Sequence, residues 1–310
     1  MSKPRRRKRK VNGILLLDKP IGCSSNQALL RVRALYEAEK AGHTGSLDPL
    51  ATGLLPICLG QATKLCGYLL DSGKRYLATA RFGEKTRTGD AEGEVMGRSD
   101  MTRVSRDDLI AMLPKFTGVI QQVPPMFSAL KHDGLRLYAL AREGVEVARE
   151  PREVTIHALE LVAFDAGTAI FDIRCSKGTY IRTLVEDIAE AMAQCAHLTA
   201  LRRIEVDPFD GARMITLDQV ETLSQQGLEA LDQLLLPTAA ALKTWPRVVL
   251  DVDRAHYMRR GHAVRVAGAP SNGDLAVFDA QGSVLCLAQI DTNGMVAPKR
   301  WLADDLEHSA

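Results

Sequence analysis

The sequence predicts an α+β protein whose main sheet is largely antiparallel, followed by a small β-rich C-terminal domain. Strand-like and helix-like segments are interspersed without a regular β-α-β succession, which argues against a parallel sheet. The chain has 310 residues, which is long for one hydrophobic core and favours two domains. An alanine-rich connector spans residues 237–246, and short strands and turns follow it. We therefore expect domains at residues 11–246 and 247–310.

The first ten residues stand apart from the rest of the chain. Residues 1–10 carry seven Lys and Arg side chains and no acid, so we expect a disordered basic tail. A solubilising role and an RNA-contacting role fit this tail equally well. Removing these seven charges from the net charge of +2 leaves −5 for residues 11–310. Any contact with nucleic-acid phosphates must then come from a local patch, because the overall charge does not supply one.

Alternation of apolar residues predicts three strands of the main body, at residues 74–83, 154–164 and 169–175. In residues 74–83, for example, Tyr76, Ala78, Ala80 and Phe82 fall on one face, as period-2 spacing requires. Two of the strands are joined by a tight turn at residues 165–167 and should form a hairpin. The expected strands are residues 13–17, 74–83, 154–164, 169–175 and 199–206, with a buried apolar segment at 54–59.

Capping residues and helical spacing place the helices. Ser25 can cap the first helix, and Ser105 with Asp108 forms a capping-box pattern. Thr216 with Gln219 caps a later one. The expected helices cover residues 25–36, 62–70, 105–115, 179–193, 228–236 and 251–260, with another starting at 216.

Residues 121–152 read as an excursion from the main body. Two prolines open the segment, and residues 126–131 can form a strand. The pair Asp133 and Gly134 predicts a hairpin turn, and a short helix over residues 136–143 should stop at Gly144. A solvated surface feature and a flexible clamp on a phosphate backbone both fit this segment. Its basic side chains are Lys131, Arg136, Arg142, Arg149 and Arg152.

Residues 42–53 are the best candidate in the sequence for a loop that carries reactive side chains. With three glycines and a proline they should be a rigid polar loop, neither helix nor strand. Asp48 is the only acid in this loop and His43 its only imidazole. Asp48 precedes Pro49, which biases its backbone to an extended shape. Taken alone, each is more often a turn or surface residue than a catalyst, and the loop lacks the lysine of a Walker phosphate cradle.

Cysteine usage and hydropathy narrow the class of protein. The six cysteines include no Cys-x-x-Cys pair, which argues against a zinc site and a disulfide framework and fits a reducing cytoplasm. The apolar run at residues 14–17 is too short for a signal peptide or a membrane span. We therefore expect a cytoplasmic protein that is not attached to a membrane.

Five ordered blocks of the sequence resemble one family. The chain is similar to the bacterial tRNA pseudouridine synthases of the TruB family, which isomerise the uridine at tRNA position 55. The resemblance covers nearly the whole chain outside the basic tail. The matching blocks are residues 18–25, 42–53, 74–76 with 86–90, 176–184 and 201–203.

The resemblance implies a function and a set of site residues. It implies a pseudouridine-synthase fold with the cleft across the middle of the sheet and a C-terminal domain of the PUA type, which binds RNA. Asp48 takes the place of the catalytic aspartate, and Arg182 is its matched partner, since a nearby positive charge favours an ionised carboxylate. The other implied substrate-binding residues are Tyr76, Tyr180 and Leu201 around the base, His43 in the gap left by a flipped uridine, and Lys19 and Lys64 on phosphates.

The implied reaction needs no redox step, so neither a cofactor nor a metal is expected. The expected partner is the T-arm stem-loop of tRNA, bound by a monomer. Three rivals remain at this point: a non-catalytic RNA-binding or tRNA-folding protein, a phosphotransferase, and a pseudouridine synthase for another RNA. The presence of Asp48 counts against the first and the missing Walker lysine against the second.

Overall fold

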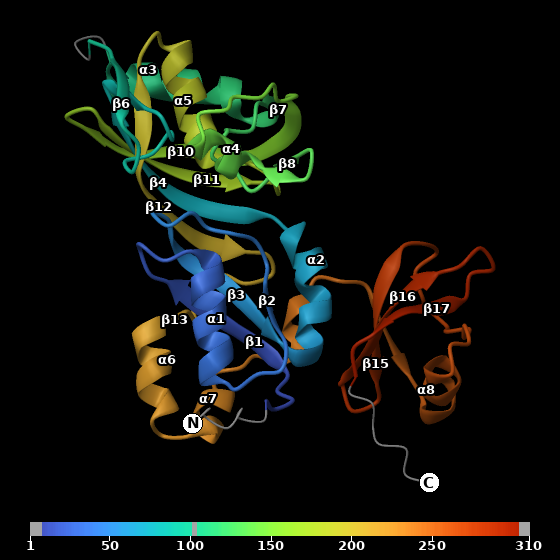
Figure 1. Ribbon diagram of the computed structural model, residues 1–310. Coiled ribbons are helices and arrows are strands. Elements are labelled where there is room, and N and C mark those ends of the chain that lie inside the picture. Colours follow the sequence, from blue (N-terminus) through green and yellow to red (C-terminus); the bar gives the residue numbers. More distant parts are fainter. Residues whose placement is uncertain (1–7, 101–103, 304–310) are drawn as a thin grey trace.

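The computed structural model describes residues 8–100 and 104–303. An elongated body is built around one twisted sheet, and a small β domain lies beside it at the C-terminal end (Figure 1). The expected α+β architecture with a small β domain is confirmed.

The main sheet has the order β13-β1-β3-β12-β4-β11-β10-β7, and β2 pairs with β3 off this path. Its pairs are antiparallel except β1 with β13 and β3 with β12, so the expectation of a largely antiparallel sheet is correct. β4 and β12 pair in the middle of the body (Figure 1). The strands are β1 (Gly13–Lys19), β2 (Ala41–His43), β3 (Thr52–Leu59), β4 (Lys74–Phe82), β7 (Gly118–Gln122), β10 (Arg152–Asp165), β11 (Thr168–Cys175), β12 (Ala196–Val206) and β13 (Ile215–Thr216).

Three helices of the body begin at capping side chains that the sequence offers. Capping boxes at Ser105 and Thr216 are present as expected. The first helix is capped by Ser24 rather than Ser25, because the Ser25 hydroxyl is engaged with the backbone of Leu47. The helices are α1 (Ser25–Leu35), α2 (Cys66–Leu70), α3 (Arg106–Met112), α4 (Leu137–Arg142), α5 (Ile181–Ala191), α6 (Leu217–Ser224) and α7 (Leu228–Asp232), with 3-10 turns η1 (Gly60–Leu65), η3 (Leu113–Phe116) and η4 (Thr238–Leu242).

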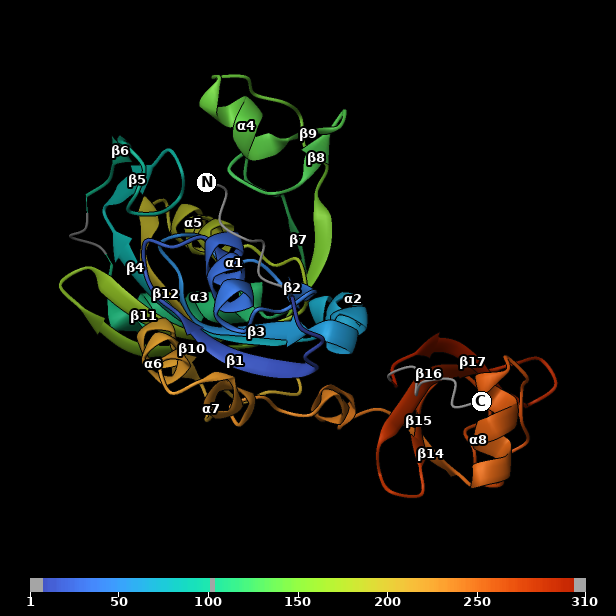
Figure 2. The same ribbon diagram turned by 60° about the horizontal axis from the view of Figure 1, so that its bottom comes forward.

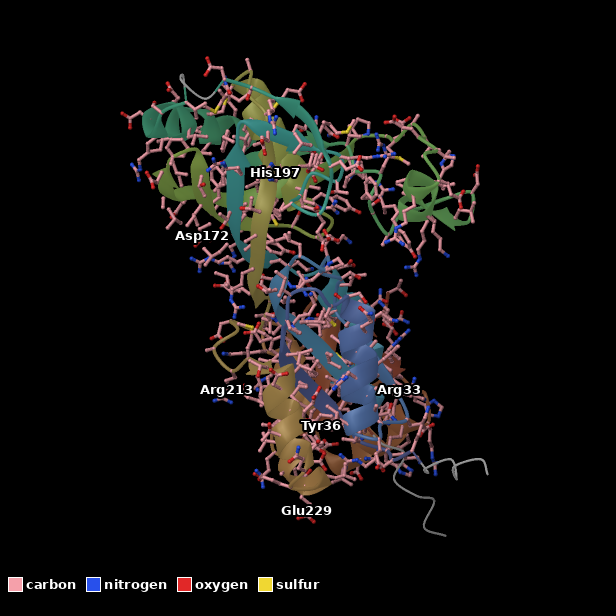
Figure 3. All side chains as sticks on the ribbon, turned by 60° about the vertical axis from the view of Figure 1, so that its left-hand side comes forward. Arg33, Tyr36, Asp172, His197, Arg213 and Glu229 are labelled. Atoms are coloured by element: carbon pink, nitrogen blue, oxygen red, sulfur yellow. The ribbon has the colours of Figure 1, made fainter. Side chains whose placement is uncertain are left out.

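The lower part of the body encloses its own apolar core between the sheet and α1, α6 and α7. Tyr36 lies at the foot of α1 beside the C-terminal helices of the body (Figure 3), and its hydroxyl donates to the Leu231 carbonyl. Arg9 joins the same corner through a bidentate pair with Asp232. The expectation of a disordered tail over residues 1–10 is therefore wrong at Arg9, and residues 1–7 lie outside the described residues.

The loop expected over residues 42–53 is partly strand. Its first two residues end β2, and Thr52 and Gly53 begin β3. Residue 53 must be a glycine for the strand to approach the Arg203 backbone this closely. A Cβ atom at this position would lie 2.2 Å from the Arg203 carbonyl oxygen. The irregular part is therefore residues 44–51, held between two paired strands.

The excursion projects from the body at the end of the sheet where β7 and β10 lie (Figure 2). It consists of the hairpin β8 (Lys131–His132) and β9 (Leu135–Arg136), followed by α4. The turn residues Asp133 and Gly134 both have positive φ, as a type I′ turn requires, and Gly144 does so after the helix. A strand over residues 126–131 is not formed, because only its last residue finds a partner. A second small hairpin follows β4 and consists of β5 (Glu84–Thr86) and β6 (Val95–Arg98).

The small domain packs β14 (Arg247–Leu250), β15 (Asp274–Asp279), β16 (Val284–Ile290) and β17 (Val296–Trp301) against α8 (Val252–Arg259). Its other side adds Ala276, Phe278, Leu287 and Leu302 to an apolar cluster with η1 and α2 of the body. The two parts therefore share buried apolar surface.

Candidate active site

A cavity of about 600 Å³ opens over the centre of the main sheet. Its walls come from β4, β12, the loop before β3 and the start of α5. The excursion adds residues 128–130 at one side. Its lining includes Asp48, Lys74, Tyr76, Tyr180, Arg182, Leu201 and Arg203.

The loop that carries Asp48 is pinned on both sides by the segment that follows β1. The Ser25 hydroxyl accepts from the Leu47 amide at 2.7 Å and donates to its carbonyl at 3.1 Å. The Pro49 carbonyl accepts from the Gly22 amide at 2.8 Å. Because the residues before and after Asp48 are both fixed, the backbone that presents this carboxylate is held without using its side chain.

Asp48 and Arg182 meet in the cavity. Arg182 Nη2 lies 2.9 Å from Asp48 Oδ2, and the side chain of Asp48 keeps 46% exposure while that of Arg182 has 6%. The guanidinium also donates to the Thr88 and Phe127 carbonyls at 2.7 and 2.8 Å. A second acid, Asp90, lies 3.7 Å from Arg182 Nε. Arg182 is thus a buried cation in a fixed orientation, and Asp48 is the member of the pair that a ligand can reach.

Aromatic and aliphatic side chains line the cavity beside this pair. Tyr76 on β4 and Leu201 on β12 are each 8% exposed and line the cavity, as expected. Burial raises the pKa of the Tyr76 phenol, so it stays protonated at neutral pH. Tyr180 is the N-cap residue of α5. Its backbone amide donates to the Gln122 side-chain oxygen, and its carbonyl accepts from the Gln122 side-chain nitrogen. These side chains form an apolar wall of the cavity next to the Asp48 carboxylate.

His43 ends β2 and is half-buried at the base of the loop. Its Nδ1 accepts from the Gly45 amide at 3.4 Å. Burial, and then the charge of Arg203, lower the pKa of this imidazole, so the ring is uncharged at neutral pH. His43 is not among the residues that line the cavity itself.

The two lysines expected on phosphates are engaged within the protein. Lys19 is 0% exposed, and its ammonium donates to the carbonyls of Pro20 and Cys23 at 2.8 and 2.5 Å. Lys64 donates to the Trp301 carbonyl at 2.7 Å and so ties the body to the small domain. Local carbonyls thus accept from both ammonium groups in this structure. The contacts of Lys19 and Lys64 with RNA phosphates stay a prediction.

Three polar residues of the site received no role from the sequence. Asp90 is buried beside Arg182, and Lys74 and Arg203 line the cavity. All three lie within the blocks that carry the family resemblance, so that resemblance could have drawn attention to them. Their burial could not be anticipated, since charged residues are most often exposed.

No helix within residues 8–100 and 104–303 is long and apolar enough to cross a membrane. Over the same residues, no group of three or more His, Cys, Asp or Glu side chains is placed to hold a metal ion. All six cysteines belong to the described part, and none forms a disulfide there.

Comparison with known proteins assigns the family. Residues 33–181 match the N-terminal domain of TruB family pseudouridylate synthase, residues 182–243 a tRNA pseudouridylate synthase B C-terminal domain, and residues 246–302 the C-terminal domain of pseudouridine synthase II TruB. The tRNA pseudouridine synthase B of Nitrosococcus oceani is 50% identical over 290 residues, 94% of each chain. That of Pseudomonas aeruginosa strain UCBPP-PA14 is 50% identical, over 97% of this chain and 99% of its own.

The chain belongs to the TruB family of pseudouridylate synthases. The resemblance of the five sequence blocks is thereby confirmed. Solved structures agree on the fold of this TruB-family protein. A crystal structure of a Cbf5-Nop10-Gar1 complex superposes with a TM-score of 0.74 at 24% identity, covering 94% of this chain and 85% of that one. An H/ACA RNP bound to a substrate RNA containing 2'-deoxyuridine gives a TM-score of 0.72 at 22% identity.

Proposed function

We propose that this TruB-family protein isomerises uridine 55 in the T-arm of tRNA to pseudouridine, with Asp48 as the catalytic residue. The observation that carries the proposal is the pair of Asp48 and Arg182 at 2.9 Å within a cavity of about 600 Å³. The names of the relatives, which cover nearly the whole chain, support tRNA as the substrate.

The reaction breaks the bond between C1′ and N1 of the uridine, turns the base, and joins C1′ to C5. The hydrogen on C5 leaves and N1 ends protonated, so atoms balance without an added reactant. A carboxylate can labilise the glycosidic bond by attack on the sugar or the base, or by stabilising positive charge at C1′. Asp48 fits this role because it is a ligand-accessible carboxylate of the cavity, and Arg182 holds its orientation.

The remaining walls bind the base. Tyr76 is a protonated phenol with a raised pKa, which makes it a stacking platform and a poor proton acceptor. Leu201 closes the pocket from β12, and Tyr180 packs at the start of α5. The uridine of a folded T-loop is stacked, so it must be flipped out to reach this pocket. An uncharged His43 suits the gap that the uridine leaves, because a neutral ring stacks without bringing a charge into the RNA.

The protein acts as a monomer in the cytoplasm, without a cofactor. One chain supplies every group that this mechanism uses, and free thiols fit a reducing compartment. The exposed Arg136 and Arg142 of the excursion contact the RNA backbone, as does the small domain, which resembles a PUA module in its position. Phosphate contacts of this kind give affinity and register rather than base identity.

Mapping pseudouridine by nucleotide after incubation with unmodified tRNA tests the proposal. We expect one new pseudouridine, at position 55, with no metal or nucleotide added. Pseudouridine at another position only would overturn the site of action. Tight binding with no pseudouridine at all would favour the rival, a non-catalytic tRNA-binding protein.

A further inference from the structure

The cavity contains a second pair of basic residues, separate from Arg182. Lys74 is the first residue of β4 and is 6% exposed, and Arg203 on β12 is 1% exposed. Both line the cavity. Arg152 and Lys177 line the cavity too, but both are exposed, so Lys74 and Arg203 are buried cations of its lining alongside Arg182.

Lys74 and Arg203 converge on one point of the cavity wall. Lys74 Nζ donates to the carbonyls of Leu70 and Ser72 at 2.7 and 2.6 Å. Arg203 donates to the carbonyls of Leu54 and Gly45 at 2.7 and 3.1 Å. A Cβ placed on Gly45 would lie 3.6 Å from Arg203 Nη1 and 3.9 Å from Lys74 Cε. Both basic side chains therefore end close to Gly45 and to each other.

The two charges have no paired acid among the described residues. Neither Lys74 nor Arg203 forms an ion pair there, and the nearby acids are already committed. Asp71 pairs with Lys177 at 2.9 Å, and Asp207 with Arg174 at 3.4 Å. Burial, and then the charge of Arg203, lower the pKa of Lys74 to about 8. Buried like charges with only carbonyl partners are unfavourable, and an incoming anion relieves that cost.

Strand periodicity places this cation pair next to the base platform. Lys74 and Tyr76 are two residues apart on β4, and Leu201 and Arg203 are two apart on β12, so each pair shares a face. Arg203 lies opposite Tyr76 in the β4–β12 register. One end of this face is cationic, and the neighbouring part is aromatic and aliphatic. A nucleotide is complementary to this face, because its anionic phosphate lies beside a flat base.

We propose that Lys74 and Arg203 form a phosphodiester subsite for a phosphate that flanks the flipped uridine. The inference rests on the proposed function. A guanidinium fork and an ammonium together suit a phosphate, because they offer several charge-assisted donors to its oxygens. The subsite would hold the backbone while Asp48 acts on the nucleoside.

Neutral linkages in the substrate test this subsite. A T-arm stem-loop would carry a single methylphosphonate either 5′ or 3′ of the target uridine, and dissociation constants and single-turnover rates would be measured. With the wild type we expect one of the two flanking substitutions to weaken binding by about 10-fold, as for loss of a charge-assisted contact. A methylphosphonate two nucleotides further away serves as the substrate control and should change binding less.

Substitutions of Lys74 then show whether this residue causes the loss of affinity. In Lys74→Met the same flanking substitution should cost less than about 3-fold, because the charge it would have met is gone. Lys74→Arg should keep the preference for the charged linkage. Lys115→Met, an exposed lysine of η3, is the matched control and should behave as the wild type does.

Two outcomes would overturn the subsite. One is equal binding of all linkages by the wild type, a result that needs no variant to fold. The other is an equal loss in the wild type and a folded Lys74→Met protein. A third result is that inorganic phosphate at constant ionic strength competes with the stem-loop while the methylphosphonates leave binding unchanged. That result would assign Lys74 and Arg203 to a free anion instead. Failure of the wild type to modify the unsubstituted stem-loop would count against the proposed function, and is a distinct result.

Discussion

The cleft and the excursion both carry arginines, but the structure uses them in opposite ways. Arg182 is buried and bonded to Asp48, Thr88 and Phe127. Arg136 and Arg142 are exposed and flank the ring of Tyr138, at 5.9 and 5.6 Å from its centroid. A buried charge is fixed in direction and insulated from salt, whereas an exposed one is mobile and screened. We therefore expect geometry from the first set and salt-dependent affinity from the second.

The largest effect should come from the carboxylate of the cleft. Asp48→Asn should abolish pseudouridine formation and leave tRNA affinity within about 3-fold, since the amide keeps the shape but loses the negative charge. Nucleotide-resolved mapping and filter binding would measure the two quantities. Asp133→Asn in the excursion turn is the matched control, because Asn also tolerates positive φ there. Substantial turnover by Asp48→Asn would refute its catalytic assignment.

Arg182 tests whether fixed geometry matters more than charge alone. Arg182→Ala should lower the single-turnover rate by about 100-fold, the usual cost of a misplaced reacting group. Arg182→Lys should recover little, because one ammonium cannot reproduce the four contacts of the guanidinium. Arg142→Lys supplies the comparison on the exposed side and should stay near the wild-type rate. Near-normal activity of a folded Arg182→Ala protein would make Arg182 a purely structural residue.

The exposed arginines should make tRNA affinity depend on the salt concentration. Replacing both Arg136 and Arg142 by Ala should weaken tRNA binding and reduce the slope of log affinity against log salt by about 1.5, if each meets one phosphate. The single-turnover rate at saturating tRNA should be retained. An unchanged slope would leave the excursion as a solvated surface feature.

The smallest effect should be a pH-dependent one from Lys74. Its pKa is lowered to about 8 from 10.5 by burial and by Arg203, with Cys175, Asp71 and Asp207 acting in the opposite direction. Between these two pH values the unfolded chain binds the proton more tightly, so the contribution of Lys74 to folding stability rises with pH. The wild type should therefore gain stability relative to Lys74→Met from pH 8 to 10.5, by at most about 1 kcal/mol per pH unit. Denaturant titrations in phosphate-free buffer would measure it, and a flat difference would contradict the shifted pKa.

Local patterns in the sequence were sufficient for most of the regular elements. Period-2 alternation located β4, β10 and β11, and capping pairs at Ser105 and Thr216 located two helix starts. These signals depend on neighbours a few residues away, so they survive without knowledge of the fold. The choice of Ser24 over Ser25 as a cap was not local, because Leu47 claims the Ser25 hydroxyl.

The sequence by itself also determined the family and the residues matched to its motifs, including Asp48, Tyr76, Arg182 and Leu201. The tertiary structure alone decided what each basic side chain does. All four of Lys19, Lys64, Lys74 and Arg203 donate to backbone carbonyls, and of these four Lys74 and Arg203 also line the cavity. A lysine or arginine has a long flexible stem and can reach water, a carbonyl or a ligand from the same backbone position. Which of these it reaches depends on groups brought near by distant parts of the chain.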